Sequence, residues 1–200
     1  MRALSPALLC LALAAPAAAA AQDDDSAPPG DPAESGSTEG DDAGGAPRYL
    51  EAMRSELEAM RVRGARCAAL DAQRARCELS ARGISTGRDF TVHLVYSDRT
   101  DTIYMYVERY LEVQPDGVTT NAVVRRLMEL NWTLLLGKFE WNATDGEVRL
   151  AMILNTDSNF DRRAFRSSVR AIGQLADRYY LELDRLVRGQ SAPAPAPAPQ

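Results

Sequence analysis

The large apolar side chains of this 200-residue chain are confined almost entirely to one stretch. Residues 22–47 contain no aromatic and no large aliphatic side chain, and residues 190–200 consist only of Gln, Ser, Ala and Pro. Segments of this composition cannot bury enough apolar surface to offset the entropy that ordering costs. We therefore expect one domain over residues 48–189, which would bury about two-thirds of its unfolded surface. The flanking segments are expected to be disordered.

The first 21 residues have the organisation of a secretory signal peptide. A basic residue, Arg2, precedes a short run of Ala and Leu, and small residues follow up to Ala21. A membrane-spanning helix needs about 20 strongly apolar residues, whereas this run is mostly alanine and is interrupted by prolines. We expect cleavage near Ala21, a periplasmic or secreted location and no stable membrane insertion afterwards. An uncleaved membrane anchor is the alternative.

Charge is unevenly distributed along the chain. Residues 22–46 carry eight acidic side chains and no basic one, whereas the chain from Arg48 onward has 22 basic and 20 acidic residues. The predicted domain is therefore nearly neutral, which gives no support for a nucleic-acid partner. The Ala-Pro repeat of residues 190–200 favours an extended polyproline II conformation. We expect a tail without a specific role, and a spacer or a docking strand is the alternative.

Apolar periodicity predicts three helices and two hairpins. The helices have apolar residues at spacings of three and four, and the strands alternate apolar and polar residues. The predicted helices cover residues 50–60, 120–130 and 161–186, and the predicted hairpins pair 90–97 with 102–113 and 134–141 with 148–154. The order is helix, two strands, helix, two strands, helix. We therefore expect an α+β fold with an antiparallel sheet of at least four strands packed against helices.

Part of the predicted domain resembles the YbjN family. The resemblance rests on Asn131, the segment Leu136-Gly137-Lys138-Phe139-Glu140-Trp141, the turn Asp145-Gly146 and the segment Ala176-Asp177-Arg178-Tyr179-Tyr180. It extends over about residues 84–187. The resemblance implies a fold like that of type III secretion chaperones, and a role as a bacterial regulator of sensory transduction or a chaperone-like module without catalytic residues. Most of these motifs are packing signals, so they indicate a fold more than an activity.

Two cysteines, Cys67 and Cys77, remain after the predicted signal peptide. An even number of cysteines in an exported protein favours a disulfide. On one continuous helix their Cα atoms would lie about 15 Å apart, whereas a disulfide needs less than about 7 Å. A bridge therefore requires a chain reversal between them. The alternatives are two free thiols or one helix running from Arg48 to Leu79.

No arrangement of residues in the sequence points to catalysis. His93 is the only histidine, so a histidine-rich metal site is excluded and no nucleophile motif accompanies it. The paired carboxylates Asp98 with Asp101 and Asp157 with Asp161 fall in predicted turns and caps, where aspartate serves the backbone. We expect a non-enzymatic protein with no cofactor and no metal. A small periplasmic enzyme that uses carboxylates and His93 is the alternative.

The first hairpin offers a candidate binding surface. If Phe90, Val92, Leu94 and Tyr96 face the helices, the other side of the sheet carries four residues that form an amphipathic patch. These residues are His93, Val95, Tyr104 and Tyr106. We expect the patch to bind a protein or peptide partner, either on a monomer or on a homodimer. Two alternatives are that a helix covers this face and that the chain is an envelope structural protein whose Ala-Pro tail spans or contacts the cell wall.

Overall fold

The computed structural model describes residues 45–157 and 159–190 of the chain. The predicted signal peptide, most of the acidic linker and nearly all of the Ala-Pro tail lie outside the described residues. Among residues 45–157 and 159–190, none of the helices combines the length and the apolar composition that a membrane span requires.

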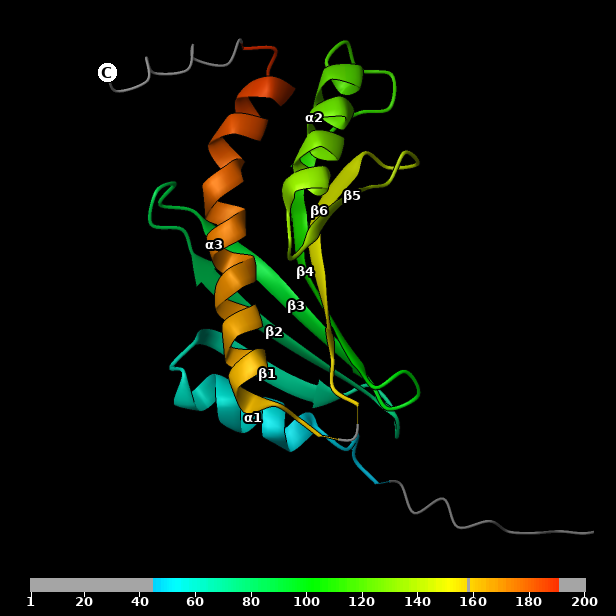
Figure 1. Cartoon of the computed structure of the whole chain (residues 1–200), viewed down its shortest axis with the longest axis vertical. Coiled ribbons are helices and arrows are strands. Elements are labelled where there is room, and N and C mark those ends of the chain that lie inside the picture. The colour runs from blue at the N-terminus through cyan, green and yellow to red at the C-terminus, as the bar shows by residue number, and fades with distance from the viewer. Residues whose placement is uncertain (1–44, 158, 191–200) are drawn as a thin grey trace, which may run out of the picture. The chain divides into compact units, whose positions relative to one another are not determined.

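The described residues form a six-stranded antiparallel sheet and three helices (Figure 1). The strands are β1 (Arg63–Ala69), β2 (Arg74–Arg82), β3 (Asp89–Ser97), β4 (Thr102–Glu112), β5 (Lys138–Trp141) and β6 (Glu147–Asn155). The helices are α1 (Leu50–Ala59), α2 (Thr120–Thr133) and α3 (Arg162–Val187). The spatial order of the strands is β1-β2-β3-β4-β6-β5. This arrangement confirms the predicted α+β fold.

Strands β1 and β2 are not predicted by the apolar pattern of the sequence. The two strands form a hairpin at one edge of the sheet, and Asp71 stabilises its turn by accepting hydrogen bonds from the backbone N–H groups of Gln73 and Arg74. Both strands are rich in alanine and arginine, which have a weaker preference for strands than β-branched and aromatic residues do. Only Ala75, Cys77 and Leu79 of β2 alternate as buried residues. The element order is therefore α-β-β-β-β-α-β-β-α.

All three helices pack on the same face of the sheet. The side chains of the sheet that face them alternate along each strand and are almost fully buried. On the four central strands they include Cys77, Leu79, Phe90, Val92, Leu94, Tyr96, Ile103, Met105, Val107, Val148, Leu150 and Met152. Helix α3 contacts β2, β3, β4 and β6, whereas α1 lies over the β1–β2 end and α2 lies beside β5 (Figure 1). The opposite face of the sheet has no helix in the described part of the chain.

Helix α3 begins where the sequence places its cap. The Asp161 carboxylate accepts a hydrogen bond from the backbone N–H of Ala164 at 2.9 Å, which satisfies one of the free N–H groups of the first turn. The helix buries five side chains at near-heptad spacing against the sheet and the other helices. These are Phe165, Val169, Ile172, Ala176 and Leu183.

A buried carboxylate joins α1 to α3. Glu56 is only 1% exposed, and its two oxygens contact the guanidinium groups of Arg162 and Arg166. The hydrogen bond from Arg166 and the positive charges of both arginines lower the pKa of Glu56, against the effect of burial. The carboxylate therefore stays ionised and fixes the first helix against the start of the last.

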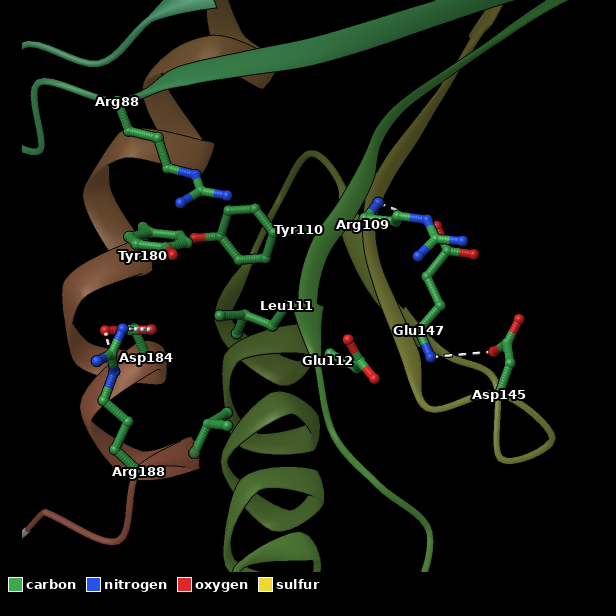
Figure 2. A pocket seen from close by; sticks show the side chains of 11 residues that line it. Arg88, Arg109, Tyr110, Leu111, Glu112, Asp145, Glu147, Tyr180, Asp184 and Arg188 are labelled. Atoms are coloured by element: carbon green, nitrogen blue, oxygen red, sulfur yellow. Dashed lines mark hydrogen bonds and ion pairs between the residues drawn. The ribbon is translucent and has the colours of Figure 1, made fainter.

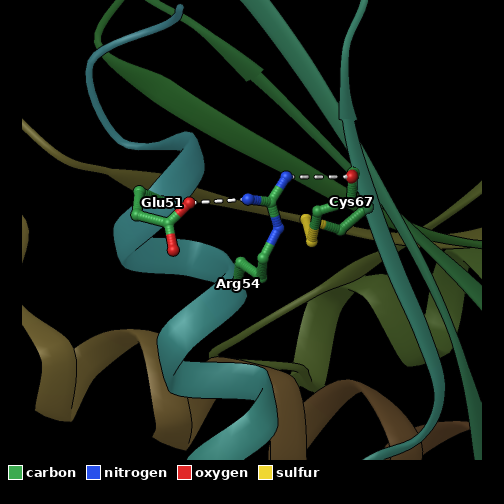
Figure 3. The surroundings of a disulfide bond; sticks show 4 residues. Glu51, Arg54 and Cys67 are labelled. Atoms are coloured by element: carbon green, nitrogen blue, oxygen red, sulfur yellow. Dashed lines mark hydrogen bonds and ion pairs between the residues drawn. A yellow bond between two sulfur atoms is a disulfide. The ribbon is translucent and has the colours of Figure 1, made fainter.

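The structure joins Cys67 and Cys77 in a disulfide. The two residues are directly paired across the β1–β2 hairpin, and their Cα atoms lie 4.1 Å apart. The hairpin supplies the chain reversal that a bridge at this spacing requires. The alternative of one continuous helix to Leu79 is therefore wrong. Figure 3 shows Arg54 of α1 beside the bridge, where it donates hydrogen bonds to the Glu51 carboxylate at 2.6 Å and the Cys67 carbonyl at 3.3 Å. The disulfide thus joins the two strands of the edge hairpin, and Arg54 joins the hairpin to α1.

Replacing both Cys67 and Cys77 with serine should lower the free energy of unfolding by about 2–3 kcal/mol, because the bridge restricts the unfolded chain over a short loop. Denaturant unfolding of the oxidised protein and of the double variant measures the difference. Thiol alkylation under denaturing, non-reducing conditions is the accompanying control. Two alkylated cysteines in the untreated protein would contradict the disulfide.

Candidate functional site

The uncovered face of the sheet is the candidate site, and we call it the open face. It carries His93, Val95, Tyr104 and Tyr106, the four residues that the sequence analysis proposes for partner binding. Strands β3 and β4 pair in a register that places His93 opposite Tyr106 and Val95 opposite Tyr104. Side chains directly opposite one another in an antiparallel pair lie on the same face, so the four residues form one patch.

The aromatic rings of the open face form a row along two strands. The ring centroids of His93 and Tyr106 lie 5.1 Å apart, and those of Tyr106 and Tyr104 lie 5.3 Å apart. The guanidinium of Arg149, from β6, lies over the Tyr106 ring at 4.9 Å from its centroid. Such contacts between rings and between a cation and a ring each contribute about 0.5–1.5 kcal/mol. The row is therefore a stabilised and ordered surface.

Charged side chains hold the Tyr104 end and the middle of this row. The Tyr104 hydroxyl donates a hydrogen bond to Glu140 at 2.5 Å, and burial together with this carboxylate raises the pKa of Tyr104. Arg149 donates to Glu147 at 2.7 Å, and this hydrogen bond raises the pKa of Arg149 against the effect of burial. The tyrosine stays neutral and the arginine stays charged at physiological pH.

His93 is the buried member of the patch. Its side chain is only 2% exposed, so it offers almost no surface to a partner. Arg76 lies 2.9 Å from Nδ1, and Glu108 lies 2.8 Å from Nε2. A guanidinium can only donate and a carboxylate can only accept, so Nδ1 must accept and Nε2 must carry the proton. The arrangement therefore selects one neutral tautomer, with both ring nitrogens already engaged.

The accessible part of the open face lies toward the hairpin turns. Val95 and Tyr104 are half-buried and border a hollow that also contains Arg74, from β2, and Arg99, from the β3–β4 turn. Ile153 of β6 is paired with Tyr104 and is 66% exposed. The sequence analysis did not include Ile153, although its alternation with Met152 and Leu154 could have placed it on this face. Arg76 was missed because β2 itself was not predicted.

A second surface of the molecule, a cleft between α3 and the end of β4, contains many ionisable residues (Figure 2). Its carboxylates are already bonded within the protein: Asp184 pairs with Arg188 at 3.0 Å, and Glu147 pairs with Arg149. In Figure 2, Asp184 lies on the α3 side of β4, whereas Glu147 and Asp145 lie on the other side. The acidic groups therefore do not converge on one point where a substrate would react.

The described residues contain no group of three or more His, Cys, Asp or Glu side chains placed to hold a metal ion. The carboxylates of the sequence-based enzyme alternative are not near His93. Asp98 accepts a hydrogen bond from Tyr96, on the helix-facing side, and Asp161 caps α3. The residue that contacts Nε2 of His93 is instead Glu108, which the sequence analysis did not consider.

The nitrogen NMR spectrum of the imidazole should show a proton on Nε2 and none on Nδ1. The reason is the fixed pair of contacts, in which Arg76 donates to Nδ1 and Glu108 accepts from Nε2. No assignment step is needed, because the chain has one histidine. An unfolded sample in denaturant serves as the control. A proton on Nδ1, or on both nitrogens, would contradict this arrangement.

The family model YbjN, described as "Putative bacterial sensory transduction regulator", matches residues 67–185. The matched region starts within β1 and ends in the last turns of α3, so it includes both cysteines of the disulfide and the four patch residues of the open face. No curated protein is similar enough to be counted as a relative. No solved structure matches the chain either. Because the match extends over more than half of the sequence and agrees with the resemblance seen in its motifs, the chain belongs to the YbjN family.

Proposed function

We propose that this YbjN protein is an exported, non-enzymatic regulatory or chaperone-like module that holds another polypeptide on the open face of its sheet. The observation that carries the proposal is the ordered aromatic row on a sheet face that no described helix covers. Membership of a family of sensory transduction regulators supports a regulatory role. The partner is a protein or peptide that binds to a monomer or a dimer of the chain.

The composition of the open face suits a polypeptide partner. Tyrosine is enriched at protein interfaces because its ring contributes apolar area while its hydroxyl still finds a hydrogen bond. Tyr104 and Tyr106 are held in place before a partner arrives, so binding would cost little side-chain entropy. Ile153 and Val95 add apolar contact, and the surrounding arginines and glutamates form a polar rim.

The state of His93 supports the absence of catalysis at this face. A general base needs a free lone pair within hydrogen-bonding reach of the substrate. The lone pair of Nδ1 is directed at Arg76, the proton of Nε2 is directed at Glu108, and the ring is almost fully buried. His93 therefore acts as a positioning residue that supports the Tyr106 ring.

Export is supported by two independent features. The sequence of residues 1–21 is typical of a signal peptide, and the bridge between Cys67 and Cys77 is the kind of cross-link that persists outside the cytosol. The regulatory interaction would then take place in the periplasm or in the medium.

Replacing Tyr104 and Tyr106 together with serine should lower the yield of a partner adduct at least tenfold, because buried tyrosines often contribute more than about 1 kcal/mol each to an interface. The measurement is photo-crosslinking in the native host from a photoreactive side chain at position 153. Leu181→Ser is the matched control, since Leu181 is a partly exposed apolar residue of α3. Thermal unfolding verifies that each variant is folded. An adduct that survives the double substitution, or that Leu181→Ser removes equally, would overturn the proposal.

Protein isolated from the native host should start near Gln22, because the signal peptide is expected to be removed after export. N-terminal sequencing and intact mass measure this. The same measurement on protein made in the cytosol of an expression host without its export machinery gives the uncleaved control. Recovery of residues 1–21 on the membrane-bound native protein would support the anchor alternative instead.

A further inference from the structure

Four large exposed apolar residues lie in α2 and in the loop that follows it, away from the open face. Trp132 is 91% exposed and Leu135 is 98% exposed, and Met128 and Leu136 are each more than half exposed. Leu135 and Leu136 are predicted in a strand, but α2 continues to Thr133 and strand β5 begins only at Lys138. The two leucines therefore lie outside the sheet.

These residues line a groove between α2 and α3. One hollow is bordered by Met128 and Trp132 from α2 and by Tyr179 from α3, and a second is bordered by Leu135 and Leu136 together with Leu175. The two hollows share Thr133, Arg178 and Tyr179, so they form one continuous groove. The groove lies on the helix side of the molecule, away from Tyr104 and Tyr106.

The groove combines apolar walls with unused hydrogen-bond donors. Among the described residues, neither the indole N–H of Trp132 nor the hydroxyl of Tyr179 forms a hydrogen bond with the protein. The guanidinium of Arg178 lies over the Tyr179 ring, at 5.3 Å from its centroid. Flat aromatic rings next to N–H and O–H donors are what proline-rich segments bind, because their backbone carbonyls are free to accept and their rings pack on aromatic faces.

The C-terminal end of α3 lies next to the start of α2. Gly189 has a positive φ of 69°, its N–H donates to the Leu186 carbonyl at 3.0 Å, and the N–H of Gln190 donates to the Arg185 carbonyl at 2.9 Å. These two bonds form a Schellman motif, which ends the helix at Gly189. The turn lies against the start of α2, where Thr119 donates a hydrogen bond to the Val187 carbonyl at 3.1 Å.

The length of the Ala-Pro tail fits the length of the groove. Helices α2 and α3 run antiparallel, since Thr119 meets Val187 and Arg126 pairs with Glu182. The far end of the groove, at Ala171, lies about 27 Å from Gly189 along α3, at about 1.5 Å per residue. Residues 191–200 would span about 31 Å as polyproline II, at about 3.1 Å per residue. A tail that leaves Gly189 and runs back along α3 therefore covers both hollows.

We propose that residues 191–200 of this chain dock in the α2–α3 groove, with proline rings packed on Trp132 and Tyr179. The tail occupies the groove in the same molecule, so any other proline-rich or apolar segment must displace it. The groove is a second interaction surface, independent of the partner site on the open face. Its occupant is determined by chain connectivity, because a tethered segment is present at an effective concentration in the millimolar range.

The test is a comparison of the indole N–H signals in nitrogen–proton NMR spectra of the full chain and of a variant that ends at Gln190. The chain has two tryptophans, and a Trp132→Phe variant assigns their signals. Deleting the tail should shift the Trp132 signal. The Trp141 signal should stay in place, because its indole donates to the Val113 carbonyl at 3.0 Å inside the protein.

A tail of equal length in which all four prolines are replaced by alanine is the matched control. It should give the spectrum of the truncated chain, since the proline rings and the polyproline II preference are both lost. Dilution separates docking within one molecule from docking into a second copy, because only the latter depends on concentration. Three results would overturn the proposal. The Trp132 signal could stay unchanged after truncation, the proline-free tail could give the same Trp132 signal as the natural tail, or the shift could disappear on dilution. None of these outcomes bears on the open face, which the tyrosine variants test separately.

Discussion

The burial of one face of α3 against the sheet organises the whole domain. Phe165, Ile172, Ala176 and Leu183 are almost completely buried, and the helix passes over four of the six strands. At its start, the arginines that hold Glu56 fix α1 to it. At its centre, the Tyr110 hydroxyl donates to the Ala176 carbonyl at 2.8 Å. Elements distant in the sequence are therefore held through contacts with this one helix.

One layer of helices buries the apolar face of the sheet. The other face is not needed for the core and can therefore carry polar and aromatic side chains. A bulge in β4, where Arg109 has a φ of 46°, lets both Tyr110 and Leu111 reach the core. It also lets the N–H of Arg109 donate to Glu147, whose other oxygen accepts from Arg149. The β4 bulge that completes the core thus also helps to position the Arg149 guanidinium over the Tyr106 ring. The order of the open face is a consequence of how the sheet packs on the other side.

The sequence was sufficient for the parts of the fold that have strong periodicity. Residues 90–97 and 161–186 alternate or repeat clearly, so the face to which His93 and Tyr106 belong and the cap at Asp161 could be predicted. The β1–β2 hairpin could not, because its buried residues are small and its strands are rich in arginine. The exposure of His93 could not be predicted either, since its burial depends on Arg76 from that hairpin and on the rings beside it. Side-chain pairing across strands requires the register, which periodicity alone does not supply.

The short strand β5 lies between the two surfaces and is bonded on both sides. On the open face, Glu140 accepts the hydrogen bond of Tyr104. On the helix side, the Asn131 side chain bonds both the N–H and the carbonyl of Phe139, at 2.7 and 3.0 Å, which attaches β5 to the end of α2 next to Trp132. Strand β5 is therefore the element that connects the Tyr104 end of the open face with the Trp132 end of the α2–α3 groove.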